Sequence, residues 1–174
     1  MTELSPSPAR GARWVVPVLV VALLAALVML GLVVKDLRHE RDLRTAGEQA
    51  DKAARAAVVS MTTYDYQSVE DDFAWVDSAG TAAFRKQYAE ISAPIKKLVV
   101  ELKAKASGTV IASAPRVEDA SHVEVLLFVD QQITNPGEAK PGLDQPRVTM
   151  SMVKSDGRWL VDDVQLKSLT GTKQ

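Results

Sequence analysis

Side chains able to do acid–base chemistry gather in one short segment of this chain. Tyr64, Asp65 and Tyr66 are consecutive, and Asp130 follows in a later apolar stretch. A carboxylate or a tyrosine at the mouth of a pocket can act as a general acid or base when its pKa is shifted. A ligand or partner pocket lined by the two rings is the second functional interpretation. These four residues are therefore the candidates for chemistry or ligand binding.

The same residues also have a structural interpretation, which we favour. Tyr64 and Tyr66 would cover the open end of a core, and Asp65 would accept hydrogen bonds from the backbone amides of a turn. The chain has two histidines. His39 lies in a charged run beside an apolar segment and His122 begins a strand-like segment, so both are expected to be solvated. We expect no catalytic residue in this set.

Two tryptophans are interpreted differently from each other. Trp159 lies in the last strand-like segment and is expected to be a core aromatic beside Phe84 or Phe128. Trp75 lies off the apolar face of the short helix predicted around it, which favours exposure. An exposed indole with apolar neighbours is typical of protein interfaces. Trp75 is therefore added to the candidates as a partner-binding residue.

Composition and motifs exclude several classes of function. The formal net charge of −1 gives no basic surface for nucleic acid, and the absence of cysteine excludes disulfides and thiol catalysis. The sequence has no glycine-rich phosphate loop, nucleophile elbow, paired-histidine motif or calcium-loop series of acids. We expect no catalytic residue, no cofactor, no metal and no nucleic-acid partner.

Residues 14–34 contain no charged side chain. At about 1.5 Å per helical residue they would span roughly 31 Å, close to the ~30 Å hydrocarbon thickness of a bilayer. A cleaved signal peptide is the rival interpretation, but its apolar region is only about 7 to 15 residues and ends in a small-residue cleavage site. Here the run passes directly into charged residues. We predict an uncleaved transmembrane helix, whose orientation is not fixed by the basic residues on both flanks.

Three helical segments are expected beyond it. Residues 36–62 lack proline and carry alanines at spacings of three and four, which predicts a continuation of the same helix. Ser68 is expected to cap a short second helix. The third helix, from about 81 to 105, is expected to be kinked or split by Pro94. It carries the clearest apolar stripe of the chain: Phe84, Tyr88, Ile91, Ile95, Leu98 and Leu102.

The pattern changes to a period of two after this third helix. Strands are predicted over 109–117, 121–134, 147–154 and 158–167, with a long loop at 135–146. Helices first and an antiparallel sheet afterwards predict an α+β domain with the helices packed on one face of a curved sheet. The cone-shaped NTF2-like fold has this order of elements, an analogy at the level of fold only.

Four short motifs together resemble the Mce-associated membrane proteins of actinobacteria. They are Thr63-Tyr64-Asp65-Tyr66, Phe84-Arg85-Lys86-Gln87-Tyr88, Thr134-Asn135 and Arg158-Trp159-Leu160-Val161-Asp162-Asp163-Val164. The order Gly80-Thr81 ahead of the second motif departs from the family's pattern. The resemblance implies a non-enzymatic, stabilising subunit of an Mce-type lipid import system, with a cytoplasmic N-terminus and an extracytoplasmic domain. It also implies Mce transporter or permease subunits as partners.

The expected organisation has five parts. They are a cytoplasmic tail at 1–13, a single-pass transmembrane helix at 14–34, a juxtamembrane helix at 35–62, an NTF2-like domain at 63–169 and a C-terminal tail at 170–174. The expected location is the cell membrane, with self-association as a further expectation. Two alternatives stay open, namely a structural scaffold of a secretion machine resembling VirB8 and a small-molecule-binding or isomerase-like enzyme.

Overall fold

The computed structural model describes residues 12–137 and 140–167. The predicted tail at 170–174 and all but the last two residues of the predicted tail at 1–13 lie outside the described residues. The chain divides into two compact units, Met1–Arg41 and Asp42–Gln174. A single helix, α1 (Ala12–Thr62), begins in the first unit and ends in the second.

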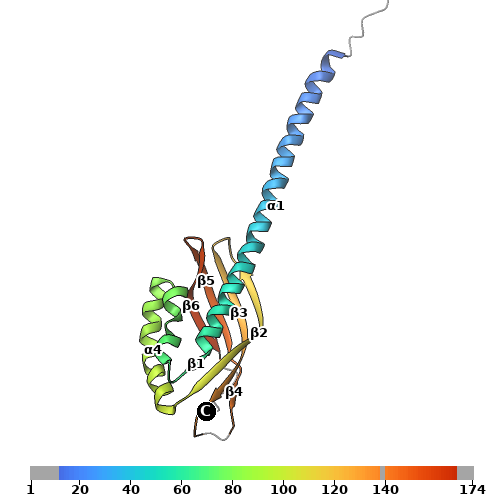
Figure 1. The fold of residues 1–174 in the computed structure, drawn as a ribbon. Helices are drawn as coiled ribbons and strands as arrows, with labels where there is room; N and C mark the ends of the chain where they lie inside the picture. The colour runs from blue at the N-terminus through green and yellow to red at the C-terminus, as the bar shows by residue number, and fades with distance from the viewer. Residues whose placement is uncertain (1–11, 138–139, 168–174) are drawn as a thin grey trace, which may run out of the picture. The chain divides into compact units, whose positions relative to one another are not determined.

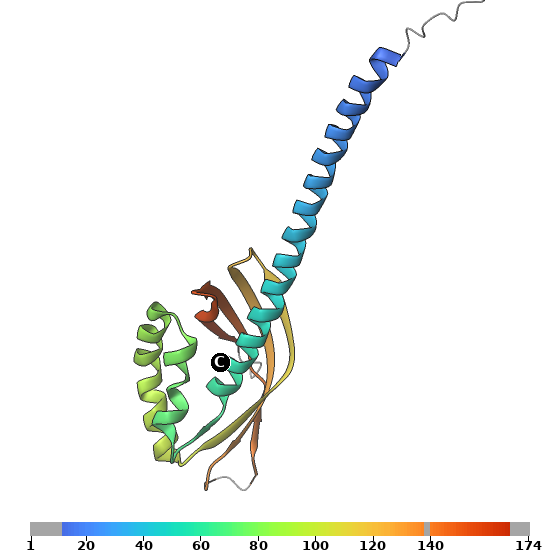
Figure 2. The ribbon, with the colours of Figure 1, turned by 45° about the horizontal axis from the view of Figure 1, so that its top comes forward.

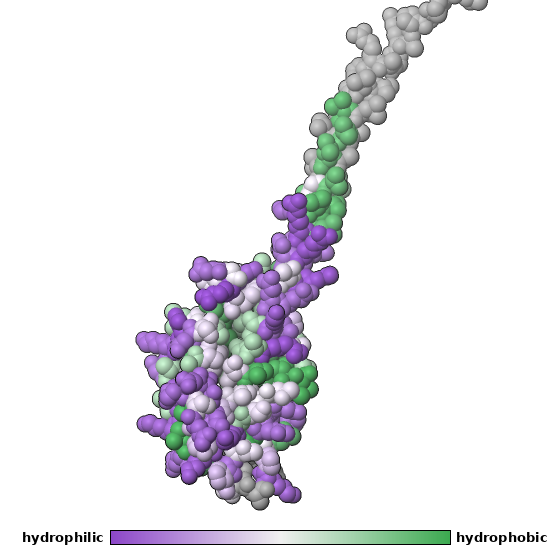
Figure 3. Space-filling model, in the orientation of Figure 1, coloured by the Kyte–Doolittle hydropathy of each residue, from purple (hydrophilic) through white to green (hydrophobic). Residues whose placement is uncertain are grey.

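In the first unit, every side chain described between Val20 and Leu37 is exposed. Figure 3 shows a hydrophobic surface along this part of α1, followed by a hydrophilic surface at the charged run that begins with Lys35. Among the residues that the structure describes, no helix has the length and apolar character needed to cross a membrane. Side chains at 14–19, 21, 22, 24–26 and 28 of the predicted span lie outside the described set. The helical state of residues 36–62 is confirmed, and the membrane crossing at 14–34 is not.

In the second unit, α1 packs through a face of very small side chains. Ala46, Ala50, Ala54 and Ala57 are buried. A Cβ added to Gly47 would lie 2.9 Å from Cγ2 of Val117 on the sheet. Small side chains let the helix backbone approach the strands closely, which larger residues at these positions would prevent. The alanine spacing seen in the sequence therefore reflects close helix–sheet packing (Figures 1 and 2).

The domain is built on one curled antiparallel sheet. Its strands are β1 (Tyr64–Asp65), β2 (Lys105–Val117), β3 (His122–Thr134), β4 (Gly142–Asp144), β5 (Arg147–Ser155) and β6 (Arg158–Lys167). The order is β1-β2-β3-β5-β6, and β4 pairs with one end of β3. Register shifts between Val110 and Ala112 and between Ser151 and Met152 mark irregularities that bend and twist the strands. The predicted α+β class with a curved antiparallel sheet is confirmed (Figure 2).

All four predicted strands are present, but the start of one was wrong and a further short strand was missed. β2 begins at Lys105 rather than 109, because the preceding helix already ends at Leu102 with Lys103 in the left-handed region at φ 49°. β4 lies inside the predicted loop at 135–146. This strand of three residues is too short to show a period, which is why the sequence did not reveal it.

Three further helices follow β1. They are α2 (Val69–Phe73), α3 (Trp75–Ala79) and α4 (Ala82–Leu102). Ser68 precedes α2 but does not cap it, because its hydroxyl donates to Asp72 Oδ2 at 2.8 Å. Thr81 caps α4 instead, accepting a hydrogen bond from the Phe84 amide at 3.1 Å. α4 is one continuous assigned helix with Pro94 inside it, so the predicted split did not occur.

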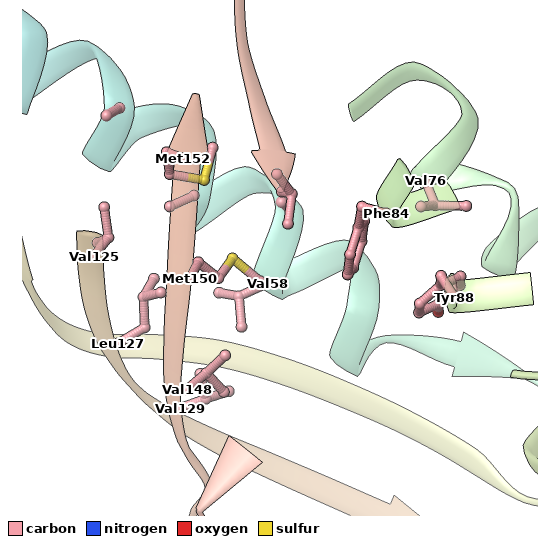
Figure 4. Packing of buried hydrophobic residues seen from close by; sticks show 14 of the residues in the cluster. Val58, Val76, Phe84, Tyr88, Val125, Leu127, Val129, Val148, Met150 and Met152 are labelled. Carbon is pink, nitrogen blue, oxygen red and sulfur yellow. The ribbon is translucent and has the colours of Figure 1, made fainter. Parts of the chain in front are cut away.

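The core lies between the sheet and the helices. On the strands, Val125, Leu127, Val148 and Met150 are fully buried. Val58 from α1 meets them from the helical layer (Figure 4). Burial of aliphatic side chains from both layers is the main stabilising contribution, at roughly 25 cal/mol per Å² of apolar surface. The helices are thus held on one face of the sheet, as the sequence predicted.

Candidate functional site

A pocket of about 200 Å³ lies where the helices meet one end of the sheet. Six helices and strands besides α4 contribute to its wall, namely α1, β1, α2, β3, β4 and β6, and most of that wall is apolar. The lining residues are Met61, Thr62, Tyr64, Phe73, Phe84, Gln87, Tyr88, Ile91, Ile95, Gln131, Asp144, Pro146, Val164 and Leu166. A mostly apolar pocket with a few polar groups is the usual form of a small-molecule site.

Aromatic rings form one side of this pocket. The Phe73 ring centroid lies 6.0 Å from that of Tyr64 and 6.4 Å from that of Tyr88. Phe84 and Tyr88 lie 5.8 Å apart on successive turns of α4 (Figure 4). Edge and tilted contacts between rings at these distances are favourable beyond the area they bury. The cluster therefore gives the pocket a rigid wall.

Trp75 belongs to this cluster and is half-buried. Its ring contacts Tyr88 edge-on at 5.2 Å, and its indole N–H donates to the Tyr88 hydroxyl at 3.1 Å. The expectation of an exposed indole at Trp75 is therefore wrong. The physical reason is that α2 and α3 meet at Ala74, which turns Trp75 towards α4. Trp75 contacts the lining residue Tyr88 and is not itself among the residues that line the pocket.

The tyrosines of the pocket are held in their neutral form. Burial raises the pKa of Tyr64. Burial also raises the pKa of Tyr88, and the hydrogen bond from Trp75 opposes this only in part. A phenol whose pKa lies above its ordinary value of about 10 is a hydrogen-bond donor and not a base at neutral pH. These rings are suited to binding rather than to proton abstraction.

Gln131 is the polar residue of the pocket that sequence reasoning missed. It lies on the inner face of β3 and is only 9% exposed. Its Nε2 donates to the carbonyl oxygen of Thr62, at the end of α1, over 2.9 Å. The alternation of β3 would have revealed it, because Val125, Leu127 and Val129 point to the same face.

Asp130 therefore lies on the opposite face of the sheet from the pocket. Successive strand residues alternate between faces, so Asp130 and Gln131 cannot share one. The Asp130 carboxylate accepts a hydrogen bond from Gln145 Nε2 at 2.8 Å. The structure does not bring Asp130 together with Tyr64; Asp130 borders a separate pocket.

Asp65 and Tyr66 also lie outside the pocket lining. Asp65 Oδ1 accepts from the Gln67 amide at 3.0 Å, as expected for a turn, and Lys105 Nζ lies 2.6 Å from Oδ2. The hydrogen bond from Lys105 lowers the pKa of Asp65, and the Gln67 amide adds to this effect. Lys105 also lies 5.6 Å from the centre of the Tyr66 ring. These contacts fix the β1 turn against β2 and give neither residue a place in the pocket.

The remaining aromatic prediction concerned Trp159. Its indole N–H donates to Gln49 Oε1 on α1 at 3.3 Å, and Lys154 lies over its ring at 5.8 Å. It is half-buried against α1, and no ring contact with Phe84 or Phe128 is found within the described ranges. The expectation that Trp159 packs beside those rings is wrong.

α4 presents an apolar stripe that no other described element covers. Ile91, Ile95, Leu98 and Leu102 are each about half exposed. They recur at spacings of four, three and four, so they share one face of the helix. The sequence grouped these four residues with Phe84 and Tyr88 in one stripe, but the buried residues of α4 are Phe84, Tyr88, Ser92 and Val99. The first two residues of the exposed stripe also border the pocket.

Side chains that could hold a metal ion were sought among the described residues. Over residues 12–137 and 140–167, no three His, Asp or Glu side chains come together as a metal site. His122 is exposed, with its Nδ1 3.0 Å from Asp119 Oδ2 in the hairpin between β2 and β3. The contacts of His122 are thus those of a turn residue.

A family model described as "Uncharacterized protein Rv1363c/MT1408-like" matches residues 12–166. Among curated relatives, the uncharacterized protein Rv1363c of Mycobacterium tuberculosis is 28% identical over 72% of this chain and 48% of its own length. The uncharacterized protein Rv1362c of the same organism is 28% identical over 66% of this chain and 56% of its own length. The chain thus spans about half the length of the curated relatives it matches.

Several solved structures have a similar fold, and two of those described next are named as type IV secretion proteins. An IcmL-like protein of Legionella pneumophila has a TM-score of 0.60 at 14% identity, covering 73% of this chain and 96% of that one. CagV, a VirB8 homolog of Helicobacter pylori, has a TM-score of 0.55 at 17% identity, covering 69% and 97%. The periplasmic domain of DotI has a TM-score of 0.57 at 13% identity, covering 67% and 91%. At these identities the likeness establishes the fold alone.

Proposed function

Because the chain belongs to the Rv1363c/MT1408-like family of uncharacterized proteins, we propose that it is a non-enzymatic accessory scaffold of a cell-envelope assembly. The observation that carries this proposal is the fold. The match covers 96% and 97% of two type IV secretion proteins and 91% of the periplasmic domain of DotI. A domain of this shape, joined to an N-terminal helix, suits a protein that works by holding other subunits in place.

The same proposal includes a tether and a side of the membrane. Residues 14–34 carry no charge and are long enough for one crossing if helical. We place a short N-terminal tail in the cytoplasm and the domain beyond Asp42 outside it. The periplasmic setting named for the DotI domain supports this orientation. The charged residues that flank the apolar run do not determine the orientation, so the proposal takes it from this comparison.

Two assemblies fit this role. The family resemblance of the four sequence motifs favours an Mce-type lipid importer, in which transporter or permease subunits would be the partners. The fold favours a VirB8-like scaffold of a secretion machine at least as strongly, since two of the similar structures are named as type IV secretion proteins. The two candidates share the scaffold role and differ in the identity of the partner.

The enzyme alternative finds little support in the pocket between α4 and the sheet. It required Asp65, Tyr66 or Asp130 inside an apolar pocket; none of the three lines this pocket, and Asp130 borders a separate one. The non-enzymatic role is supported by this arrangement and stays a proposal. A carboxylate that does line the pocket, Asp144, accepts from the Gln145 amide through Oδ1.

The experiment is affinity purification of the full chain from native membranes after mild crosslinking, followed by mass spectrometry. A scaffold should recover Mce or permease subunits in the first case, or secretion-machine subunits in the second. A matched variant, Leu127→Asp, keeps residues 14–34 intact but places a carboxylate at a fully buried position of the domain. Partners that are no longer recovered with Leu127→Asp bind the domain, and partners that are still recovered bind the helix.

Failure to recover envelope subunits, together with unaltered lipid uptake and secretion in a deletion strain, would contradict the scaffold proposal. Recovery of a soluble metabolic enzyme as the main partner would contradict it as well. The two assemblies are distinguished by the subunits that are more abundant with the unaltered chain than with Leu127→Asp. These are Mce or permease subunits in the first case and secretion-machine subunits in the second.

A further inference from the structure

The pocket between α4 and the sheet has the features of a ligand site. Its volume of about 200 Å³ would hold roughly seven groups of water size, at ~30 Å³ each. Aromatic and aliphatic side chains form most of the wall. Such walls favour an apolar body, since water bound there has few hydrogen-bond partners.

The pocket also has an unused polar group. Gln131 is 9% exposed, and its Nε2 is engaged by the Thr62 carbonyl oxygen at 2.9 Å. Its Oε1 makes no hydrogen bond within the described part of the chain. Among the described residues, Asp51 Oδ1 is the one fully enclosed side-chain oxygen or nitrogen atom without a hydrogen-bond partner. Gln131 Oε1 also lacks a partner but does not belong to this class, so it is accessible to solvent. An amide oxygen accepts hydrogen bonds, and this one is available to a ligand.

Charge restricts the ligand further. The lining has a single carboxylate, Asp144, and it has no lysine, arginine or histidine among the described residues. An anionic ligand would meet no cation there and would have to leave water, which is costly for a charged group. A neutral molecule avoids this cost. The site therefore differs from one built for fatty acids or phosphates.

We propose that this pocket binds a small neutral amphiphile, whose apolar body contacts the aromatic wall and whose hydroxyl or N–H group donates to Gln131 Oε1. Ile91 and Ile95 border the pocket and are about half exposed, so the ligand can enter past them. The site lies within one chain and needs no partner protein. It is therefore independent of the scaffold role proposed above.

The test uses the four isoleucines of the chain as reporters. The full chain is placed in lipid nanodiscs with ¹³C-labelled isoleucine methyl groups and titrated with 1-hexanol or with hexanoate. Binding should shift the Ile91 and Ile95 methyl signals saturably. Ile111 does not line this pocket but borders another one and is 59% exposed, so its methyl signal reports binding elsewhere on the chain. Hexanoate should bind at least tenfold more weakly than hexanol.

Chain length gives a second readout. From 1-butanol to 1-hexanol, each added methylene should tighten binding about fourfold, the equivalent of ~0.8 kcal/mol per buried methylene. Beyond the pocket's capacity of roughly seven water-sized groups, this gain should stop. Affinity that keeps rising with length in parallel with membrane partitioning would overturn the proposal.

Two pairs of variants locate the site. Gln131→Leu should weaken hexanol binding about fivefold by removing the acceptor, whereas Gln132→Leu, at the exposed neighbouring position, should not. Ile95→Trp should block the pocket, whereas Ile111→Trp should leave it open. If Gln131→Leu does not fold, the Ile95→Trp result decides. Equal binding of hexanol and hexanoate, or unchanged binding in Ile95→Trp, would refute the site.

Discussion

Asp119 is the residue whose ionisation the fold controls most strongly among those with a resolved shift. Its Oδ1 accepts from the Ser121 hydroxyl at 2.8 Å, from the Ser121 amide at 2.7 Å and from the His122 amide at 2.8 Å. The Ser121 hydroxyl contributes most, and together these bonds lower the pKa of Asp119 to about 2. The charged carboxylate thus organises the hairpin between β2 and β3.

This gives a prediction for pH. Because the folded pKa is depressed, the stabilisation by Asp119 is present above its unfolded value near 3.9 and is lost as pH falls towards 2. In Asp119→Ala, the free energy of unfolding should depend less steeply on pH between 4 and 2. Asp119→Asn should lose the same dependence while keeping an acceptor for the turn. A carboxyl titration by NMR that finds Asp119 near 3.9 in the folded protein would contradict this.

Gly108 offers a steric prediction at the same scale. A Cβ built there would lie 1.9 Å from Thr62 Oγ1 and 2.7 Å from Thr62 Cβ, so β2 and the end of α1 would have to separate. Gly108→Ala should lower the free energy of unfolding by about 1–3 kcal/mol in chemical denaturation. In Gly137→Ala the nearest atom is 3.4 Å away, and the change should stay within about 0.5 kcal/mol. Equal effects in the two variants would argue against the close contact.

Among the elements, α4 places its apolar side chains in different surroundings. Phe84, Tyr88 and Val99 pack into the core, whereas Leu98 is about half exposed. A stripe with a helical period identifies a helix but does not say which neighbour covers it. That is why residues of similar hydrophobicity on α4 should contribute very unequally to stability.

Adjacent valines test this inequality directly. Val99 is 4% exposed and Val100 is 47% exposed. Val99→Ala should cost about 1.5–3 kcal/mol of unfolding free energy, from lost burial and the cavity left behind. Val100→Ala should change it by less than about 0.5 kcal/mol. Thermal or urea unfolding of the two variants provides the measurement, and a larger loss in Val100→Ala would show that the Val100 side chain is covered.

At the scale of the whole molecule, the first unit and the domain differ in what surrounds their apolar side chains. Described apolar side chains of the first unit, such as Leu23, Leu27 and Leu30, are more than half exposed. In the domain, Leu127 and Met150 are fully buried. Exposed apolar residues in such numbers call for a non-aqueous environment, which is the physical basis of the proposed membrane tether.

Topology is testable because the chain has no cysteine of its own. Single cysteines at Asn135 and at Ser7 should differ in whole cells. A membrane-impermeant thiol reagent should label Asn135→Cys and spare Ser7→Cys until the cells are lysed. Labelling of Ser7→Cys alone would reverse the proposed orientation. A mature protein recovered from the soluble fraction without residues 14–34 would contradict the tether itself.

Much of the fold followed from local pattern, whereas much of the candidate site did not. The periods of the helices and strands are properties of neighbouring residues, so the α+β class and four strands were predicted correctly. Of the five candidate site residues, only Tyr64 lines the pocket. Asp130 borders a different pocket, because it lies on the opposite face of β3 from Gln131, whose inward position the alternation of β3 also predicts.

By itself, the sequence determined the order of the helices and strands, the alanine face of α1 and the uncharged run at 14–34, because each depends on residues close together in the chain. Tertiary structure alone decided that Tyr64, Gln131 and Leu166 line one pocket and that Leu98 stays exposed on α4. These outcomes depend on contacts between residues far apart in the chain, which the curl of the sheet and the close approach of α1 bring together. No local period carries that information.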